Sequence, residues 1–155
     1  IISKLKKLAN NSDLCRSRIC IHKNNSAKTN EMIISLKKGS YIRPHTHPNL
    51  KSESYHVIKG SMIVFVFNKR GDLKKRIKMG EAKTNLNFYY RMSKSFYHMP
   101  VATSSFCIYH ETYSGPFIKE KDVIFPKWSP DLNDKEHYLK FLKKNKLAKY
   151  FNEKR

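Results

Sequence analysis

The stretch that most constrains the fold runs from Gly39 to Gly60 and reads GSYIRPHTHPNLKSESYHVIKG. It contains two histidines one residue apart, His45 and His47, then the carboxylate of Glu53, with a glycine at each end. In a β-strand, residues i and i+2 point to the same side, so the two imidazoles can meet at one point. Glu53 follows a proline-containing turn and can return on the neighbouring strand as a third ligand. Two imidazoles and a carboxylate suit a divalent transition metal; the alternative is two partly exposed strand histidines beside an unrelated glutamate.

The spacing of this frame resembles the first signature of the cupins: Gly39, five residues, HTH, five residues, Glu53, six residues, Gly60. Cupins usually have three or four residues between the second histidine and the glutamate, so this chain has one or two extra residues in the turn. Three segments, SRICIHKN, YIRPHTHP and GPFIKEKDVIFPKWSPD, resemble the WbuC-type cupin metalloproteins over roughly residues 16–131. The resemblance implies a mainly β, single-domain cupin, a double-stranded β-helix or jelly-roll barrel.

The second cupin signature commonly reads Pro-x-Gly-x-x-His and supplies a further histidine to the metal. This chain has Ser93 in place of the proline and Ser95 in place of the glycine, but it keeps His98. By resemblance, His98 is therefore the fourth ligand, joining the two histidines and the glutamate of the first signature. His110 is the alternative to His98. The expected cofactor is one divalent transition metal: zinc, iron, manganese or nickel.

Three residues near the predicted ligands are candidates for binding a substrate. On a strand through the histidines, Tyr41 and Arg43 share their face, and Tyr55 shares a face with Glu53 on the next strand. A buried arginine is costly unless paired, so Arg43 either grips a substrate carboxylate or phosphate or forms an internal ion pair, for example with Glu111. The two tyrosines, Glu111 and His110 are also candidate general bases, and the sequence does not single one out.

Short strands separated by turns every 8–12 residues predict a β-sandwich or barrel. Residues 61–67 form a continuous apolar run, which is typical of a strand covered on both sides. Apolar residues at helical spacing open the chain, and Asn133 with Glu136 three residues later predicts the cap of a C-terminal amphipathic helix. We expect three regions: an N-terminal helix (1–12), the barrel with an extension (13–131) and a C-terminal helix packed on the barrel (132–155). The aromatic extension around Phe117 and Trp128 either packs outside the sheet, as expected, or lines the barrel mouth.

The formal charge of +20 comes from 32 basic and 12 acidic residues. Because lysine dominates the basic residues and no nucleic-acid-binding signature is present, a nucleic-acid partner is not expected. The positive field would instead concentrate anionic small molecules, such as nucleotide-linked sugars. No apolar run approaches the roughly 18 residues of a membrane-spanning helix. Three cysteines without zinc-ribbon spacing argue against a disulfide scaffold, and the cytoplasm is the expected location.

The WbuC-type resemblance implies a link to O-antigen and other surface polysaccharides. It therefore suggests a metal-dependent enzyme, an isomerase or epimerase, acting on a nucleotide-linked sugar or related saccharide. One alternative is an Fe(II) cupin oxygenase with Arg43 on the carboxylate of a small organic acid. Another is a non-catalytic, metal-bound small-molecule-binding or accessory protein. Cupins often pair through sheet edges, so the resemblance also implies a homodimer.

Overall fold

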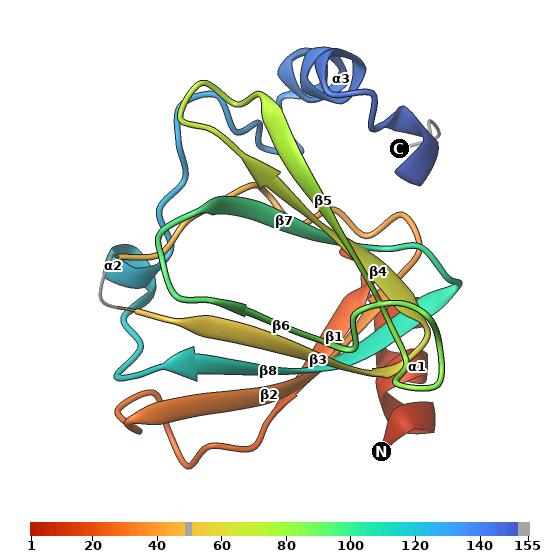
Figure 1. Cartoon of the computed structure of the whole chain (residues 1–155), viewed down its shortest axis with the longest axis vertical. Helices are drawn as coiled ribbons and strands as arrows, with labels where there is room; N and C mark the ends of the chain where they lie inside the picture. Colours follow the sequence, from red (N-terminus) through yellow and green to blue (C-terminus); the bar gives the residue numbers. More distant parts are fainter. Residues whose placement is uncertain (49–50, 152–155) are drawn as a thin grey trace.

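Two antiparallel sheets face each other in the computed structural model, which describes residues 1–48 and 51–151 (Figure 1). The five-stranded sheet has the order β1 (Arg16–Cys20), β2 (Thr29–Lys37), β8 (Phe106–Ser114), β3 (Glu53–Lys59) and β6 (Tyr89–Met92). The three-stranded sheet has the order β5 (Leu73–Gly80), β4 (Ser61–Phe67) and β7 (Tyr97–Ala102). Strands distant in sequence, such as β2 and β8, are neighbours in the sheet. This mainly β architecture confirms the predicted sandwich or barrel.

β4 is buried on both faces, as its apolar run predicted. Side chains alternate along a strand. Met62 and Val64 therefore pack into the core between the two sheets, whereas Ile63 and Phe65 pack into a second core. That second core lies between the three-stranded sheet and the C-terminal helix α3 (Lys135–Lys144), which appears beyond this sheet in Figure 1.

The remaining helices are short. α1 (Ile2–Asn10) lies against β1 and β2 with Leu5 and Ala9 fully buried, and α2 (Lys119–Asp122) belongs to the extension after β8. A 3₁₀ turn, η1 (Ala148–Tyr150), follows α3, and residues 152–155 of the expected C-terminal region lie outside the described residues. None of the helices in the described residues combines the length and apolar character that crossing a membrane requires.

The cap of α3 differs from the prediction by one residue. Asp134, not Asn133, is the N-cap, and its carboxylate accepts a hydrogen bond from the backbone N–H of His137 at 3.1 Å. The backbone N–H of Asn133 is instead bound by the side chain of Asp131 at 3.0 Å, which places Asn133 in the preceding turn. Both residues favour caps, and this local contact decides between them.

The two glycines that flank the histidine segment have backbone conformations that only glycine adopts readily. Gly39 and Gly60 have φ angles of +87° and +83°. A Cβ atom on Gly60 would lie 2.2 Å from the carbonyl oxygen of Phe106, so a side chain has no room there. The frame spacing therefore reflects backbone requirements at both ends of the histidine segment.

The histidine segment itself is not the continuous strand that the sequence predicted. Only two isolated bridges form, between His45 and His98 and between Thr46 and Ile124. Pro44 has no N–H to donate and fixes its φ, so it interrupts strand pairing just before His45. The expected alternation of side chains therefore does not extend to the residues before Pro44. Tyr41 is buried in the second core, where its hydroxyl donates to the carbonyl of Pro130 at 3.0 Å.

Candidate metal centre

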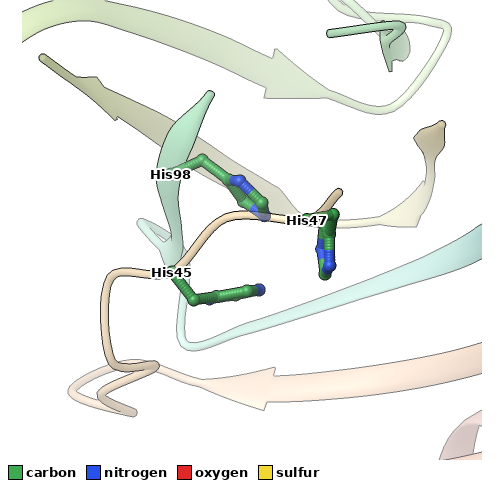
Figure 2. A group of neighbouring side chains, drawn as sticks. All are labelled: His45, His47 and His98. Atoms are coloured by element: carbon green, nitrogen blue, oxygen red, sulfur yellow. The ribbon is translucent and has the colours of Figure 1, made fainter. Parts of the chain in front are cut away.

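Three imidazoles from distant parts of the chain converge on one point. Figure 2 shows His45 and His47, from the segment before β3, pointing toward His98 of β7. One ring nitrogen of each lies within 4.8 Å of the others. Reciprocal backbone hydrogen bonds hold His45 against His98, at 3.2 Å and 2.8 Å. The bridge thus fixes the separation of two of the three rings.

The second ring nitrogen of each histidine is held by a backbone carbonyl. Because a carbonyl oxygen only accepts, each Nδ1 carries the proton and donates it. In the neutral ring, Nε2 then keeps a lone pair, as metal-binding histidines require. The acceptors for His45, His47 and His98 are the carbonyls of Arg43 (2.9 Å), Asp122 (2.5 Å) and Phe96 (2.9 Å), respectively.

The carboxylate of Glu53 completes the cluster. Its Oε2 lies 3.3 Å from Nε2 of His47 and 3.0 Å from Nε2 of His98, and the side chain is 5% exposed. These three atoms are buried and have no hydrogen-bond partner among the described residues. Buried polar atoms normally have hydrogen-bond partners, so the absence of a partner for all three atoms indicates that they bind a further group. Three neutral imidazoles and a carboxylate fit a divalent transition metal.

The surroundings favour the ligating forms of most of these groups. Burial, followed by the neighbouring His98 and His47, lowers the pKa of His45 to about 3. Burial raises the pKa of Glu53, but His98 and His47 outweigh it and hold the net pKa below its usual range. For His47, burial lowers the pKa and Glu53 raises it more, so the net shift is upward. His47 is therefore the ring for which a proton competes with a metal.

A cavity of about 550 Å³ opens over the cluster. Tyr55 and Glu111 line it, and burial followed by the charge of Glu53 raises the pKa of both well above their ordinary values.

Phe117 and Phe125 of the extension also line the cavity, whereas Trp128 packs in the second core at 5.5 Å from the ring of Phe67. The expectation that the extension packs outside the sheet is therefore wrong for the two phenylalanines, because the bridge from Thr46 to Ile124 draws this segment over the mouth.

The three expected substrate-binding residues have different positions. Tyr55 and Arg43 line the cavity, whereas Tyr41 lies in the second core. Glu111, the example of an ion-pair partner that the sequence suggested for Arg43, is not the partner observed. Instead, the Arg43 guanidinium lies 3.4 Å from the carboxylate of Asp131 and 4.5 Å from the ring of Phe125, and its Nε donates to the carbonyl of Ser129 at 3.1 Å. Of the two alternatives for Arg43, the internal ion pair is therefore present, and its acid is Asp131.

His110 lies away from the three-histidine cluster. It sits on β8 opposite His56 of β3, and its Nε2 lies 3.4 Å from Oε1 of Glu31. Sequence reasoning did not single out two other residues that line the cavity, Arg16 and Arg18 on β1. Their i, i+2 spacing was the available signal, since it places both on one face of a strand.

The comparisons place this chain among proteins of the same fold. A family described as "Domain of unknown function (DUF6016)" matches residues 1–79 of the 155. No curated protein matches the chain.

Three solved structures illustrate the fold match. Protein SO0799 from Shewanella oneidensis has 12% identity and a TM-score of 0.61 over 87% of this chain and 85% of its own. KdgF from Halomonas sp. has 12% identity and a TM-score of 0.50 over 68% of this chain and 82% of its own. An HTH_3 family transcriptional regulator from Vibrio cholerae has 15% identity and a TM-score of 0.54 over 74% of this chain, which spans 60% of the regulator. These likenesses confirm the predicted cupin-type fold, while the finer WbuC-type likeness stays a prediction.

Proposed function

The chain belongs to the DUF6016 family, and from its cupin fold and histidine cluster we propose that it is a metal-dependent cupin acting on a small anionic molecule of the sugar type. The observation that carries this proposal is the set of buried, partnerless atoms of His47, Glu53 and His98 facing one point. With His45, these residues would hold one divalent transition metal. When bound, the metal supplies a Lewis-acid or redox centre that can polarise a ligand oxygen or activate water.

The protein's own residues orient and protect this centre. The three Nδ1–carbonyl bonds fix the ring planes, so the ligands need little reorganisation. The raised pKa values of Tyr55 and Glu111 favour their protonated forms. Each can therefore donate a hydrogen bond from Oη or from the carboxyl group to a ligand oxygen in the cavity. Ile34, Ile42 and Phe125 add apolar wall and exclude water.

Size and charge support a small anionic ligand. A cavity of about 550 Å³ lies within the range of small-molecule sites. The net charge of +20 favours the approach of anions. We propose further that the ligand is a nucleotide-linked sugar or related saccharide, used in surface polysaccharide biosynthesis of the O-antigen type. This finer proposal is supported by the WbuC-like flanking sequences and by the hydrogen-bond donors of the cavity.

The test is a thermal-shift screen of metal-loaded protein against nucleotide-linked sugars and small organic acids, followed by product analysis of every binder. Stabilisation by a nucleotide-linked sugar with conversion to an isomer or epimer would support the proposal. Oxygen uptake with Fe(II) and an organic acid would replace it with the oxygenase. Binding without turnover would indicate a sensor or accessory protein, and no metal binding under any loading condition would overturn the metal-dependent function.

A further inference from the structure

Two arginines of β1 project into the cavity at a distance from the histidine cluster. In the β1–β2 register, Arg16 lies opposite Leu36 and Arg18 lies opposite Ile34, and both partners belong to the core between the sheets. The two arginines therefore lie on the inner face of the sheet, and both line the cavity. β1 is three strands from β3 in the sheet order, roughly 14 Å at the usual strand spacing.

Neither Arg16 nor Arg18 forms an ion pair in the described part of the chain. Arg16 donates from Nη1 to the carbonyl of Tyr41 at 2.8 Å, which fixes the side chain without neutralising it. The side chain of Arg18 is exposed at the cavity wall and makes no hydrogen bond or ion pair with residues 1–48 or 51–151. Burial lowers the pKa of Arg16, Tyr109 opposes this shift, and the like charge of Arg18 lowers the pKa further.

The acids that line the cavity form no ion pair with the two arginines. Among the described residues these are Glu53 and Glu111. Glu53 faces the histidines. Burial and then the charge of Glu53 raise the pKa of Glu111, although Arg18 lowers it, and the carboxyl group of Glu111 forms no ion pair with Arg18. A guanidinium whose side chain has no partner is available to an anion, and its planar fork matches the oxygens of a carboxylate or phosphate. Arg43 is already paired with Asp131 and is a weaker candidate.

We propose that Arg18, positioned beside the fixed Arg16, binds the oxyanion group of the cavity's ligand. The ligand then has a carboxylate or phosphate at the β1 wall and oxygen donors facing the histidine cluster, as in a sugar acid or a sugar phosphate. The placement of the second end rests on the proposed metal-dependent function. The anion site itself depends only on β1.

The experiment compares the binding of glucose, glucuronate and glucose 1-phosphate by calorimetry at fixed ionic strength. Wild type, Arg18→Gln and Arg18→Lys are measured with and without metal. Arg76→Gln, which removes one exposed positive charge from β5, is the control for long-range electrostatics. The two anionic probes distinguish a carboxylate-bearing ligand from a phosphate-bearing one.

We expect an anionic probe to bind wild type more tightly than glucose does. Loss of a charged hydrogen-bonding partner predicts about 10- to 100-fold weaker binding to Arg18→Gln, a smaller loss with Arg18→Lys and none with Arg76→Gln. Metal content should be the same in all four proteins. Absence of anion binding to wild type at millimolar concentration, or equal losses in Arg18→Gln and Arg76→Gln, would overturn the inference. Dependence on Arg18 in a protein that never binds metal would support the anion site and refute the proposed function instead.

Discussion

At the scale of single residues, the candidate centre is defined by where its protons lie. Each histidine donates a hydrogen bond from Nδ1–H to a backbone carbonyl. The Nε2 atoms of the neutral rings and the Glu53 carboxylate can then only accept hydrogen bonds. Acceptors that face one another repel unless a cation or proton lies between them. The site therefore has two occupants that compete, a proton on His47 and a metal ion.

This competition predicts a pH dependence of metal binding. The raised pKa of His47 stabilises the metal-free fold below the unfolded value of about 6.5, and this contribution is lost as pH rises through the folded value. Because the metal requires the unprotonated ring, its affinity should fall about tenfold per pH unit once His47 is protonated. His45, with a pKa near 3, does not contribute in this range. Competition titrations from pH 8 to pH 6 test this, and a constant dissociation constant would contradict it.

Replacing Glu53 by glutamine should separate metal binding from folding. The amide keeps the shape and can donate to a partnerless imidazole Nε2. Above the pH at which His47 titrates, Glu53→Gln should therefore not lower the melting temperature of metal-free protein. Loss of the anionic ligand should weaken metal binding at least tenfold and reduce the metal-induced thermal shift. The control is Glu31→Gln, which alters the Glu31–His110 contact on β2 and β8. Equal thermal shifts in the two variants would count against Glu53 as a ligand.

At the scale of elements, the site depends on a strand buried on both sides and on an irregular segment pinned at two points. β4 supports both cores, and β7 beside it carries His98. The segment that carries the other two histidines pairs only at His45 and Thr46. The short bridge between His45 and His98 therefore connects the histidine segment to the strands that form the core.

The second core provides a stability test within one helix. Leu142 of α3 is 4% exposed, whereas Leu139 on the same helix is 48% exposed. Leu142→Ala should lower the free energy of unfolding by about 2–5 kcal/mol, because it leaves a cavity in a packed core. Leu139→Ala should change it by less than about 0.5 kcal/mol. Denaturant unfolding measures both, and equal effects would show that α3 is not held on the sheet as described.

The elements that the sequence predicted are those in which local pattern and tertiary burial agree. The apolar run of β4 and the turn glycine Gly60 are examples, because each follows from the local chain alone. The position of Tyr41 could not be predicted by alternation, since Pro44 breaks the strand on which the argument relied. The course of the extension through Phe117 and Phe125 depends on contacts with distant residues, and no local periodicity encodes it. Histidine spacing suggested the cluster, but its Nδ1 acceptors are backbone carbonyls and leave no trace in sequence.

At the scale of the whole molecule, charge is the dominant feature. A net charge of +20 on 155 residues opposes compaction through self-repulsion. Raising the ionic strength from 0.01 M to 0.1 M shortens the Debye length from about 30 Å to about 10 Å. The melting temperature of metal-free protein should therefore rise over this range of sodium chloride. The rise should be smaller for Lys78→Glu, which lowers the net positive charge at an exposed position of β5. A melting temperature that falls with salt would contradict this interpretation.

The central claim is that one metal is held by His45, His47, Glu53 and His98. Elemental analysis of tag-free protein tests it most directly, on wild type, His98→Ala, the double variant His45→Ala/His47→Ala, and His110→Ala as the matched histidine control. We predict one equivalent of a single divalent metal in wild type and in His110→Ala, and little or none in the other two, with all four proteins folded. Stoichiometric metal in His98→Ala or in the double variant, or equal loss in His110→Ala, would contradict the site.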